Sequence, residues 1–171
     1  GFDPGDNVVQ IDLDPGETVS CTYTNTEEAS ITIIKDTVPN GPQDFAYTTT
    51  GAELAGFSLD DDAEGTLSNT KLFSGLSDFT GLRRVSETTV AGWDLTLISC
   101  SGDSELVIGQ LDGSGNFVEG SVGFQAGDDT VQIDLDPGEI VSCTYTNTEE
   151  GKITIIKNTV PDGGQDFSYA V

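Results

Sequence analysis

Three cysteines are the first residues in this sequence whose spacing suggests a reaction, the oxidation of two thiols to a disulfide bond. Cys21 and Cys143 begin two copies of one stretch, CTYTNTEEASITIIKDTVP at 21–39 and CTYTNTEEGKITIIKNTVP at 143–161, whereas Cys100 occurs once. A full copy therefore has two cysteines, and the natural pairing is Cys100 with Cys143, which suits an oxidising, extracellular compartment. Two buried, reduced cysteines are the alternative, and no spacing resembles a zinc site.

A second group of candidate residues is acidic. Asp60, Asp62 and Glu64, followed by Gly65, place carboxylates at alternate positions before a turning glycine, as at the start of a calcium-binding loop. Lys71 stands where an EF-hand needs a bidentate Glu, so an EF-hand is excluded. A looser calcium site in a hairpin and a solvated acidic turn are the two interpretations, and no other cofactor is expected.

Lys35 and Asn147 form a third candidate pair. In ITIIK, Lys35 shares a strand face with the isoleucines two and four positions before it, and in CTYTN, Asn147 shares a face with the preceding tyrosine and cysteine. If these apolar residues face the core, both polar groups follow them inward. Burial would then favour a neutral Lys35 amine, which is a nucleophile. The alternative is that Lys35 extends to water at a strand end and Asn147 caps a turn.

The charge of the chain excludes several classes of function. There are 30 acidic residues against 6 Lys and Arg, with no His, and the formal net charge is −24. Such a surface repels phosphate, so nucleic acid is not an expected partner, and most of the acids are expected to form a solvated face. No apolar run is long enough to span a bilayer. Without His, a nucleophile elbow or a phosphate-binding glycine loop, we expect no enzyme.

The elements that position these residues are predicted to be short strands, because no helical periodicity of convincing length is present. Alternation predicts strands at 9–13 and 18–25, joined by the turn DPGE into a hairpin that recurs at the second DPGE, 136–139. Further strands are expected at 45–49, 56–59 and 71–74. Val85 and Glu87 are expected on one strand face, and Trp93 is expected to open the next strand after a turn.

The repeat defines the expected domains. Residues 1–49 align with residues 123–171 at an offset of 122 without a gap, with 36 of 49 positions identical. We expect 29–150 to be one complete repeat, 1–28 the C-terminal part of a preceding repeat and 151–171 the N-terminal part of a following one. The true termini and any anchor are expected to lie outside the sequence. The connection between repeats is very short, which predicts a stiff rod.

The order and spacing of three residues resemble those of a known family. Lys35 at the end of ITIIKD, Glu87 in VSETTVAGW and Asn147 at the end of CTYTN resemble the collagen-adhesin B-type, prealbumin-like (transthyretin-like) domains of bacterial surface proteins and pili. The resemblance implies an all-β fold of tandem, immunoglobulin-like β-sandwiches. It also implies an isopeptide bond between Lys35 and Asn147 with loss of ammonia, in which a protonated Glu87 donates a hydrogen bond to the Asn147 carbonyl.

Together these features predict a structural, extracellular protein, secreted or displayed on the cell surface. Its repeats would form the shaft of a fibre, filament, pilus or adhesin stalk, with neighbouring repeats of the same protein as partners in a self-assembled filament. One alternative is a repeated adhesion module that binds carbohydrate or protein, which would require an exposed aromatic surface. Trp93, the one tryptophan, is expected in the core instead. A spacer for a distant functional domain is a further alternative.

Overall fold

The computed structural model describes residues 5–62, 64–102, 105–161 and 163–169. Within them the chain forms ten strands and no helix, and therefore no helix that could cross a membrane. In chain order the strands are β1 Ala29–Val38, β2 Phe45–Thr50, β3 Phe57–Leu59, β4 Thr70–Leu76, β5 Arg83–Glu87, β6 Trp93–Ser101, β7 Val107–Leu111, β8 Phe117–Glu119, β9 Thr130–Ile133 and β10 Ile140–Glu149.

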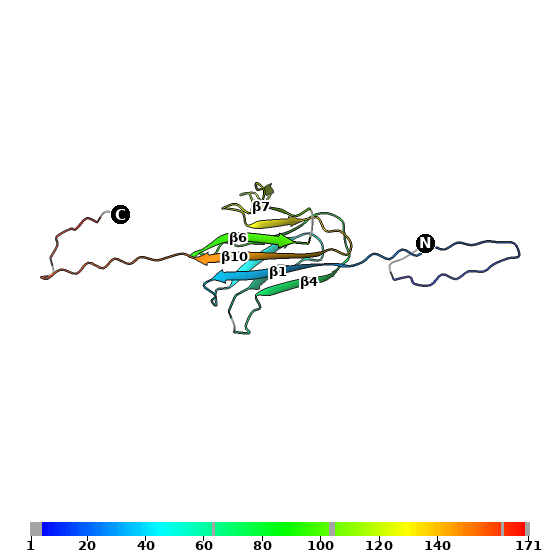
Figure 1. The fold of residues 1–171 in the computed structure, drawn as a ribbon, viewed down its shortest axis with the longest axis horizontal. Helices are drawn as coiled ribbons and strands as arrows, with labels where there is room; N and C mark the ends of the chain where they lie inside the picture. Colours follow the sequence, from blue (N-terminus) through cyan, green and yellow to red (C-terminus); the bar gives the residue numbers. More distant parts are fainter. Residues whose placement is uncertain (1–4, 63, 103–104, 162, 170–171) are drawn as a thin grey trace.

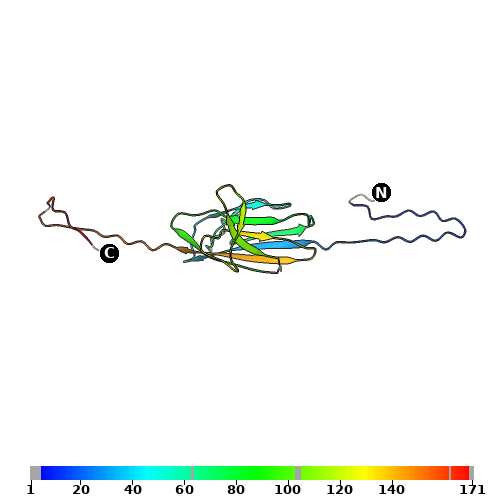
Figure 2. The same ribbon diagram turned by 90° about the horizontal axis from the view of Figure 1, so that it is seen from above.

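The strands form two sheets that pack against each other as a sandwich (Figures 1 and 2). The order in one sheet is β4-β1-β10-β6, and in the other β3-β2-β5-β9-β7-β8. In the first sheet, β1 and β10 are parallel neighbours, although they are the first and last strands of the domain. Their antiparallel partners β4 and β6 form the edges. All-β architecture, expected from the short alternating segments, is therefore present.

The core lies between the two sheets and follows from the alternation of apolar residues. Every second residue of β1 is buried from Ala29 to Thr37, and the same period of two runs through β10. Together with inward residues of the second sheet, these form one apolar cluster. Its buried members are Ala29, Ile31, Ile33, Phe45, Tyr47, Leu59, Phe73, Leu76, Val85, Ile98, Val131, Ile133, Leu135, Val141, Cys143 and Tyr145.

The predicted DPGE hairpin is wrong. Strand β9 pairs with β5 and β7 in one sheet, whereas β10 pairs with β1 and β6 in the other, so the turn at 136–139 carries the chain between the sheets. The buried residues of both strands face the core, but they do so from opposite sheets and not as neighbours within one sheet. In the first copy, residues 9–13 and 18–25 form no strand at all and are exposed.

The other predicted strands are present. Those expected at 45–49, 56–59 and 71–74 correspond to β2, β3 and β4, and Trp93 begins β6. Val85 and Glu87 both point inward from β5.

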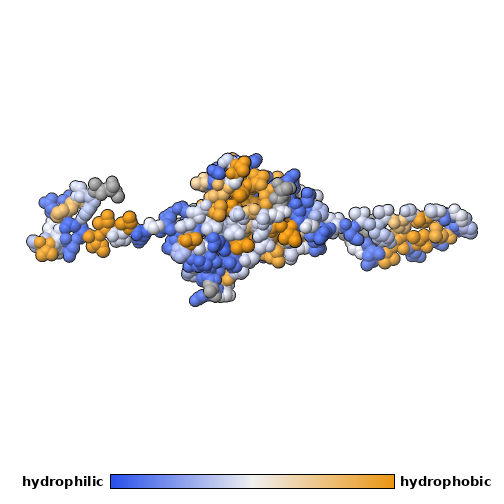
Figure 3. All heavy atoms as spheres, viewed as in Figure 1, coloured by the Kyte–Doolittle hydropathy of each residue, from blue (hydrophilic) through white to orange (hydrophobic). Residues whose placement is uncertain are grey.

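The segments that flank the sandwich leave it at opposite ends (Figure 1) and expose residues whose equivalents are buried. At the offset of 122, Ile153 corresponds to Ile31, and the exposed fractions of the two residues are 89% and 0%. The hydrophobic atoms of both flanking segments are visible at the surface in Figure 3. By contrast, all sixteen buried members of the apolar cluster lie between Ala29 and Tyr145, so the sandwich contains its own core.

Candidate functional site

Lys35 and Asn147 meet because β1 and β10 are parallel neighbours. Their register pairs Thr37 with Asn147 and Lys35 with Tyr145, so the two side chains point to the same side of the sheet, two residues apart. Both follow the apolar alternation of their strands into the core, where Lys35 is 1% and Asn147 is 2% exposed. The structure thus places these polar groups inside the sandwich and not at a solvated strand end.

Glu87 approaches the pair from β5 in the opposite sheet and is 6% exposed. Lys35 Nζ donates hydrogen bonds to Asn147 Oδ1 and, at 3.0 Å, to Glu87 Oε2. Asn147 Nδ2 donates to Glu87 Oε1 at 2.7 Å. One carboxylate therefore contacts the amine nitrogen through one oxygen and the amide nitrogen through the other.

Aromatic residues that sequence reasoning missed complete the site. The hydroxyl of Tyr47 donates to Glu87 Oε2 at 2.9 Å, and Lys35 Nζ lies 4.1 Å from the centroid of the Phe45 ring. The ring of Tyr145 packs edge-on against that of Tyr47, with centroids 5.3 Å apart, and its carbonyl oxygen accepts a bond of 3.2 Å from Lys35 Nζ. The alternation of Phe45 and Tyr47 in a predicted strand was the one available signal.

Burial dominates the electrostatics of the site. Desolvation lowers the pKa of Lys35 from its ordinary value, although the neighbouring Glu87 opposes this shift. Burial and then the charge of Glu87 raise the pKa of Tyr47 far above its ordinary value, so its hydroxyl keeps its proton and stays a donor. The site therefore favours a neutral lysine amine more than water does.

A cavity of about 200 Å³ adjoins the site. Glu87 and Asn147 line it together with Trp93, Asp94 and Asp128. A small molecule released at Asn147 would enter a space with acidic walls.

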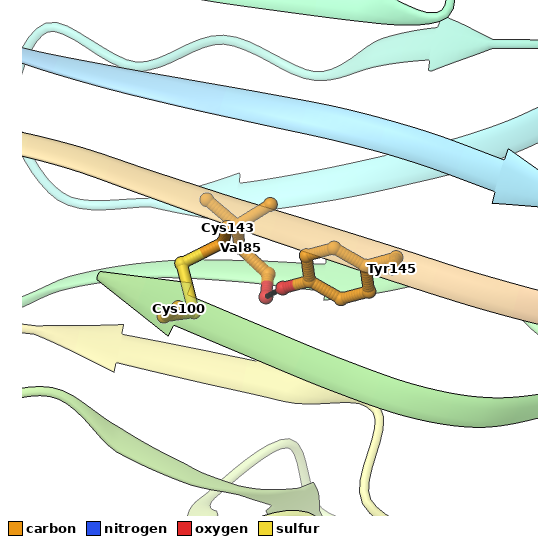
Figure 4. The surroundings of a disulfide bond; sticks show 4 residues. All are labelled: Val85, Cys100, Cys143 and Tyr145. Atoms are coloured by element: carbon orange, nitrogen blue, oxygen red, sulfur yellow. Dashed lines mark hydrogen bonds between the residues drawn. A yellow bond between two sulfur atoms is a disulfide. The ribbon is translucent and has the colours of Figure 1, made fainter.

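Cys100 and Cys143 form a disulfide bond between the neighbouring strands β6 and β10 (Figure 4). They are direct partners in the register of these strands, with Cα atoms 4.1 Å apart. Beside this bond, the hydroxyl of Tyr145 donates to the Val85 carbonyl oxygen at 2.8 Å and so joins the two sheets. Cys21, in the flanking segment, is exposed and free.

The predicted acidic residues do not gather around a common point. Asp60 is buried with its Oδ1 unpartnered, while Asp62 Oδ1 accepts the backbone N–H of Glu64 at 2.8 Å and Glu64 is exposed. In the described part of the chain, no group of three or more Asp, Glu, Cys or His side chains is arranged to hold a metal ion. Asp61, between them, accepts the backbone N–H of Thr37 at 2.9 Å. Calcium binding stays a prediction.

Trp93 packs onto the core without joining an aromatic surface. It is half-buried, and its ring meets that of the fully buried Phe45 edge-on, with centroids 5.6 Å apart. The feature that would have favoured a binding module, Trp93 exposed beside other rings, is not seen among the ring contacts of the described residues.

Comparison with known proteins agrees with the fold. No curated protein and no solved structure matches the chain. The family model described as a prealbumin-like fold domain matches residues 31–149, which span the sandwich from β1 to β10. This match confirms the resemblance drawn from Lys35, Glu87 and Asn147. The chain belongs to the family of prealbumin-like fold domains.

Proposed function

We propose that this chain is part of the shaft of an extracellular fibre, pilus or adhesin stalk, in which each sandwich is closed by an isopeptide bond between Lys35 and Asn147. The observation that carries the proposal is the contact of Lys35 Nζ with both Asn147 and Glu87 in a site from which water is almost excluded. A buried amine beside a buried amide has no clear use in stability alone, since desolvating both groups is costly.

The reaction balances with the groups present. Glu87 first takes a proton from the Lys35 ammonium, which leaves a neutral amine and a neutral carboxyl group. Nζ then attacks Cγ of Asn147, and the Cγ–Nδ2 bond breaks as Glu87 gives a proton to Nδ2 and accepts the second proton of Nζ. The products are one amide, ammonia and a protonated Glu87.

The surrounding residues assist this step. Tyr47 donates to the same Glu87 oxygen that contacts Lys35, which fixes the carboxylate between the two nitrogens. The reacting groups are thus held in contact before reaction, which removes most of the entropic cost of bringing them together. The adjoining cavity, with Asp94 and Asp128 in its walls, gives the ammonia a way out.

The position of the bond suits a protein under tension. The chain enters at the start of β1 and leaves at the end of β10, at opposite ends of the sandwich (Figure 1). Tension on a tandem array would pull these parallel neighbours past each other. A bond from Lys35 to Asn147 would carry that force from β1 to β10 directly and bypass the rest of the domain.

A tandem, extracellular arrangement is supported by four further observations. The flanking segments repeat the ends of the sandwich at an offset of 122. They expose the apolar residues that their equivalents bury, as expected of strands that belong to further sandwiches. The disulfide bond between Cys100 and Cys143 suits an oxidising compartment, and prealbumin-like domains of this kind are typical of surface proteins.

Intact mass spectrometry tests the proposal. The 171-residue chain, produced without reductant, should weigh less than its sequence by one ammonia, and the deficit should survive reduction and denaturation. The Lys35→Ala variant should show no such deficit, whereas Lys152→Ala, a change of an exposed lysine in the segment after β10, should keep it. An unmodified mass of the folded protein would refute the cross-link.

A further inference from the structure

A hollow of about 370 Å³ lies at the end of the sandwich where the chain leaves. It is lined by residues 39–43, Trp93 and Glu149, and we call it the Trp93 hollow. Residues 39–43 follow the end of β1, Trp93 begins β6, and Glu149 ends β10, so the lining belongs to one pole of the domain. No residue of the isopeptide site lines it.

The connection to the next copy is very short. Glu149 is the last residue of β10, and Gly151 is equivalent to Ala29, the first residue of β1, at the offset of 122. Glu150 is thus the one residue between β10 and the expected first strand of the next copy. Its backbone N–H donates to the Gly92 carbonyl oxygen at 2.8 Å. If the next copy folds as this one does, a linker of one restrained residue would leave its sandwich next to this pole.

The opposite pole shows how the connection meets the domain that follows it. Glu27 and Glu28 are the equivalents of Glu149 and Glu150. A Cβ atom added at Gly138 would lie 2.9 Å from Glu27 Oε2, and one added at Gly75 would lie 3.4 Å from Glu28 Oε2. Glu27 thus contacts the 136–139 turn of the domain that follows it. Its equivalent, Glu149, lines the hollow of the domain that precedes the next connection.

We propose that the Trp93 hollow is an interdomain socket that receives the N-terminal pole of the next copy, with the 136–139 turn of that copy as the part that enters. This inference rests on the proposed tandem arrangement and adds the residues that make its joints rigid. The lining of proline, glycine and indole offers an apolar surface, and the amides of Asn40 and Gln43 can donate to the acidic turn. A filled socket would turn a string of sandwiches into a stiff rod.

Quenching of Trp93 fluorescence tests the socket in a chain of two complete copies, residues 29–150 followed directly by a second 29–150. Trp93→Phe in the second copy leaves a reporter in the filled socket, and Trp93→Phe in the first copy leaves one in the vacant socket. The acrylamide quenching constant of Trp93 in the filled socket should be about half or less of that in the vacant socket, since the next domain covers the indole ring. Both chains contain one altered copy, so they are matched controls.

Insertion of about ten Gly and Ser residues at the junction should raise quenching of the first reporter to the level of the second, because a flexible linker releases the poles. Equal quenching of the two reporters without the insertion would overturn the socket. The intact masses of the same samples report the isopeptide bonds separately. A deficit of two ammonia molecules with equal quenching would leave the cross-linked shaft standing with flexible joints, whereas unmodified masses with unequal quenching would remove the cross-link and keep the socket.

Discussion

Glu87 determines what the Lys35–Asn147 pair can do, because its two oxygens contact two different nitrogens. Oε2 faces Lys35 Nζ and Oε1 faces Asn147 Nδ2, so a single group can take a proton from the nucleophile and give one to the leaving group. Without it, the amine would keep its proton and the amide would keep its nitrogen. The proposed reaction therefore depends on one buried carboxyl group.

The Glu87→Gln variant tests this role. Gln has nearly the same size and can still hydrogen-bond to Asn147, but it cannot take a proton from Lys35. We expect a folded protein with the full, unmodified mass and a lower melting temperature than the wild type. Glu119→Gln, an exposed change on β8, is the matched control and should keep the ammonia deficit. Loss of ammonia by the Glu87→Gln variant would show that another group transfers the proton.

A pH dependence follows from the lowered pKa of Lys35 and can be measured when the cross-link is blocked by Asn147→Ala. In the unfolded chain Lys35 holds its proton up to its ordinary value of 10.5, whereas in the folded chain it releases the proton at lower pH. Between these values the unfolded state binds more protons, so the free energy of unfolding rises with pH.

The reference for that measurement is the double variant Asn147→Ala/Lys35→Met, which lacks the titrating amine. We expect the free energy of unfolding of the single variant, relative to that of the double variant, to rise as the pH increases toward 10.5. Urea denaturation at several pH values measures it. Parallel stability profiles would mean that Lys35 titrates in the fold as it does in water.

At the scale of elements, the sequence predicts strands and faces better than it predicts partners. The alternation of apolar and polar residues correctly predicted β2, β3, β4 and the start of β6. It also predicted that Lys35 and Asn147 point inward with their apolar neighbours, as they do. The same pattern could not decide that β9 and β10 belong to different sheets. Each strand has one apolar face, and that face would be buried both in a hairpin within one sheet and in two opposite sheets. Partner choice depends on contacts between distant segments, which local alternation does not encode.

The candidate site likewise contains residues that the sequence predicts and residues that it does not. The inward positions of Lys35 and Asn147 follow from strand faces, whereas the grouping of both residues with Glu87 came from the resemblance to a family. The support by Tyr47 and Phe45 depends on how the second sheet lies over the first, and a sequence pattern contains no such distance. Strands β7 and β8 were not predicted, and they are short strands at one edge of the larger sheet.

The junction of β6 and β10 gives a prediction about an element. Gly102, at the end of β6, has φ of +104°, and a Cβ atom there would lie 1.9 Å from the Ile140 carbonyl oxygen at the start of β10. Gly115, between β7 and β8, has φ of +81° and open space around the same position. The two glycines share a left-handed backbone conformation, but only at Gly102 would an added methyl group collide with a neighbouring strand.

Gly115→Ala should therefore cost about 1 to 2 kcal/mol, the usual penalty of a left-handed conformation. Gly102→Ala should cost clearly more, because the carbonyl oxygen and the methyl group cannot both keep their positions. Chemical denaturation of both variants under oxidising conditions measures the difference. Similar losses of stability would show that the start of β10 moves freely away from β6.

At the scale of the whole molecule, the mechanical resistance of the sandwich depends on where the chain enters and leaves it. Tension enters through β1 and leaves through β10, and these strands are parallel neighbours, so the hydrogen bonds between them are loaded together in shear. The proposed bond would join them between Lys35 and Asn147, near their ends. The disulfide between Cys100 and Cys143 lies inside the loop that this bond closes, and therefore carries force only when the isopeptide bond is absent.

Single-molecule pulling on the 171-residue chain separates the two covalent links. With both formed, the sandwich should show no unfolding step, because only the few residues outside Lys35 and Asn147 can extend. Lys35→Ala should unfold in one step under oxidising conditions. Reduction should lengthen that step by about 150 Å, since 43 residues are freed at about 3.5 Å each.

The Glu87→Gln variant provides a second test in case Lys35→Ala weakens the fold, because it blocks the cross-link and keeps the lysine. Its step should equal that of Lys35→Ala and respond to reductant in the same way. If the wild type unfolded with the same step as these variants, force would pass through the whole domain and the isopeptide path would not exist. The wild type should resist with and without reductant, because the disulfide lies inside the loop that the proposed isopeptide bond closes and bears force only in the variants.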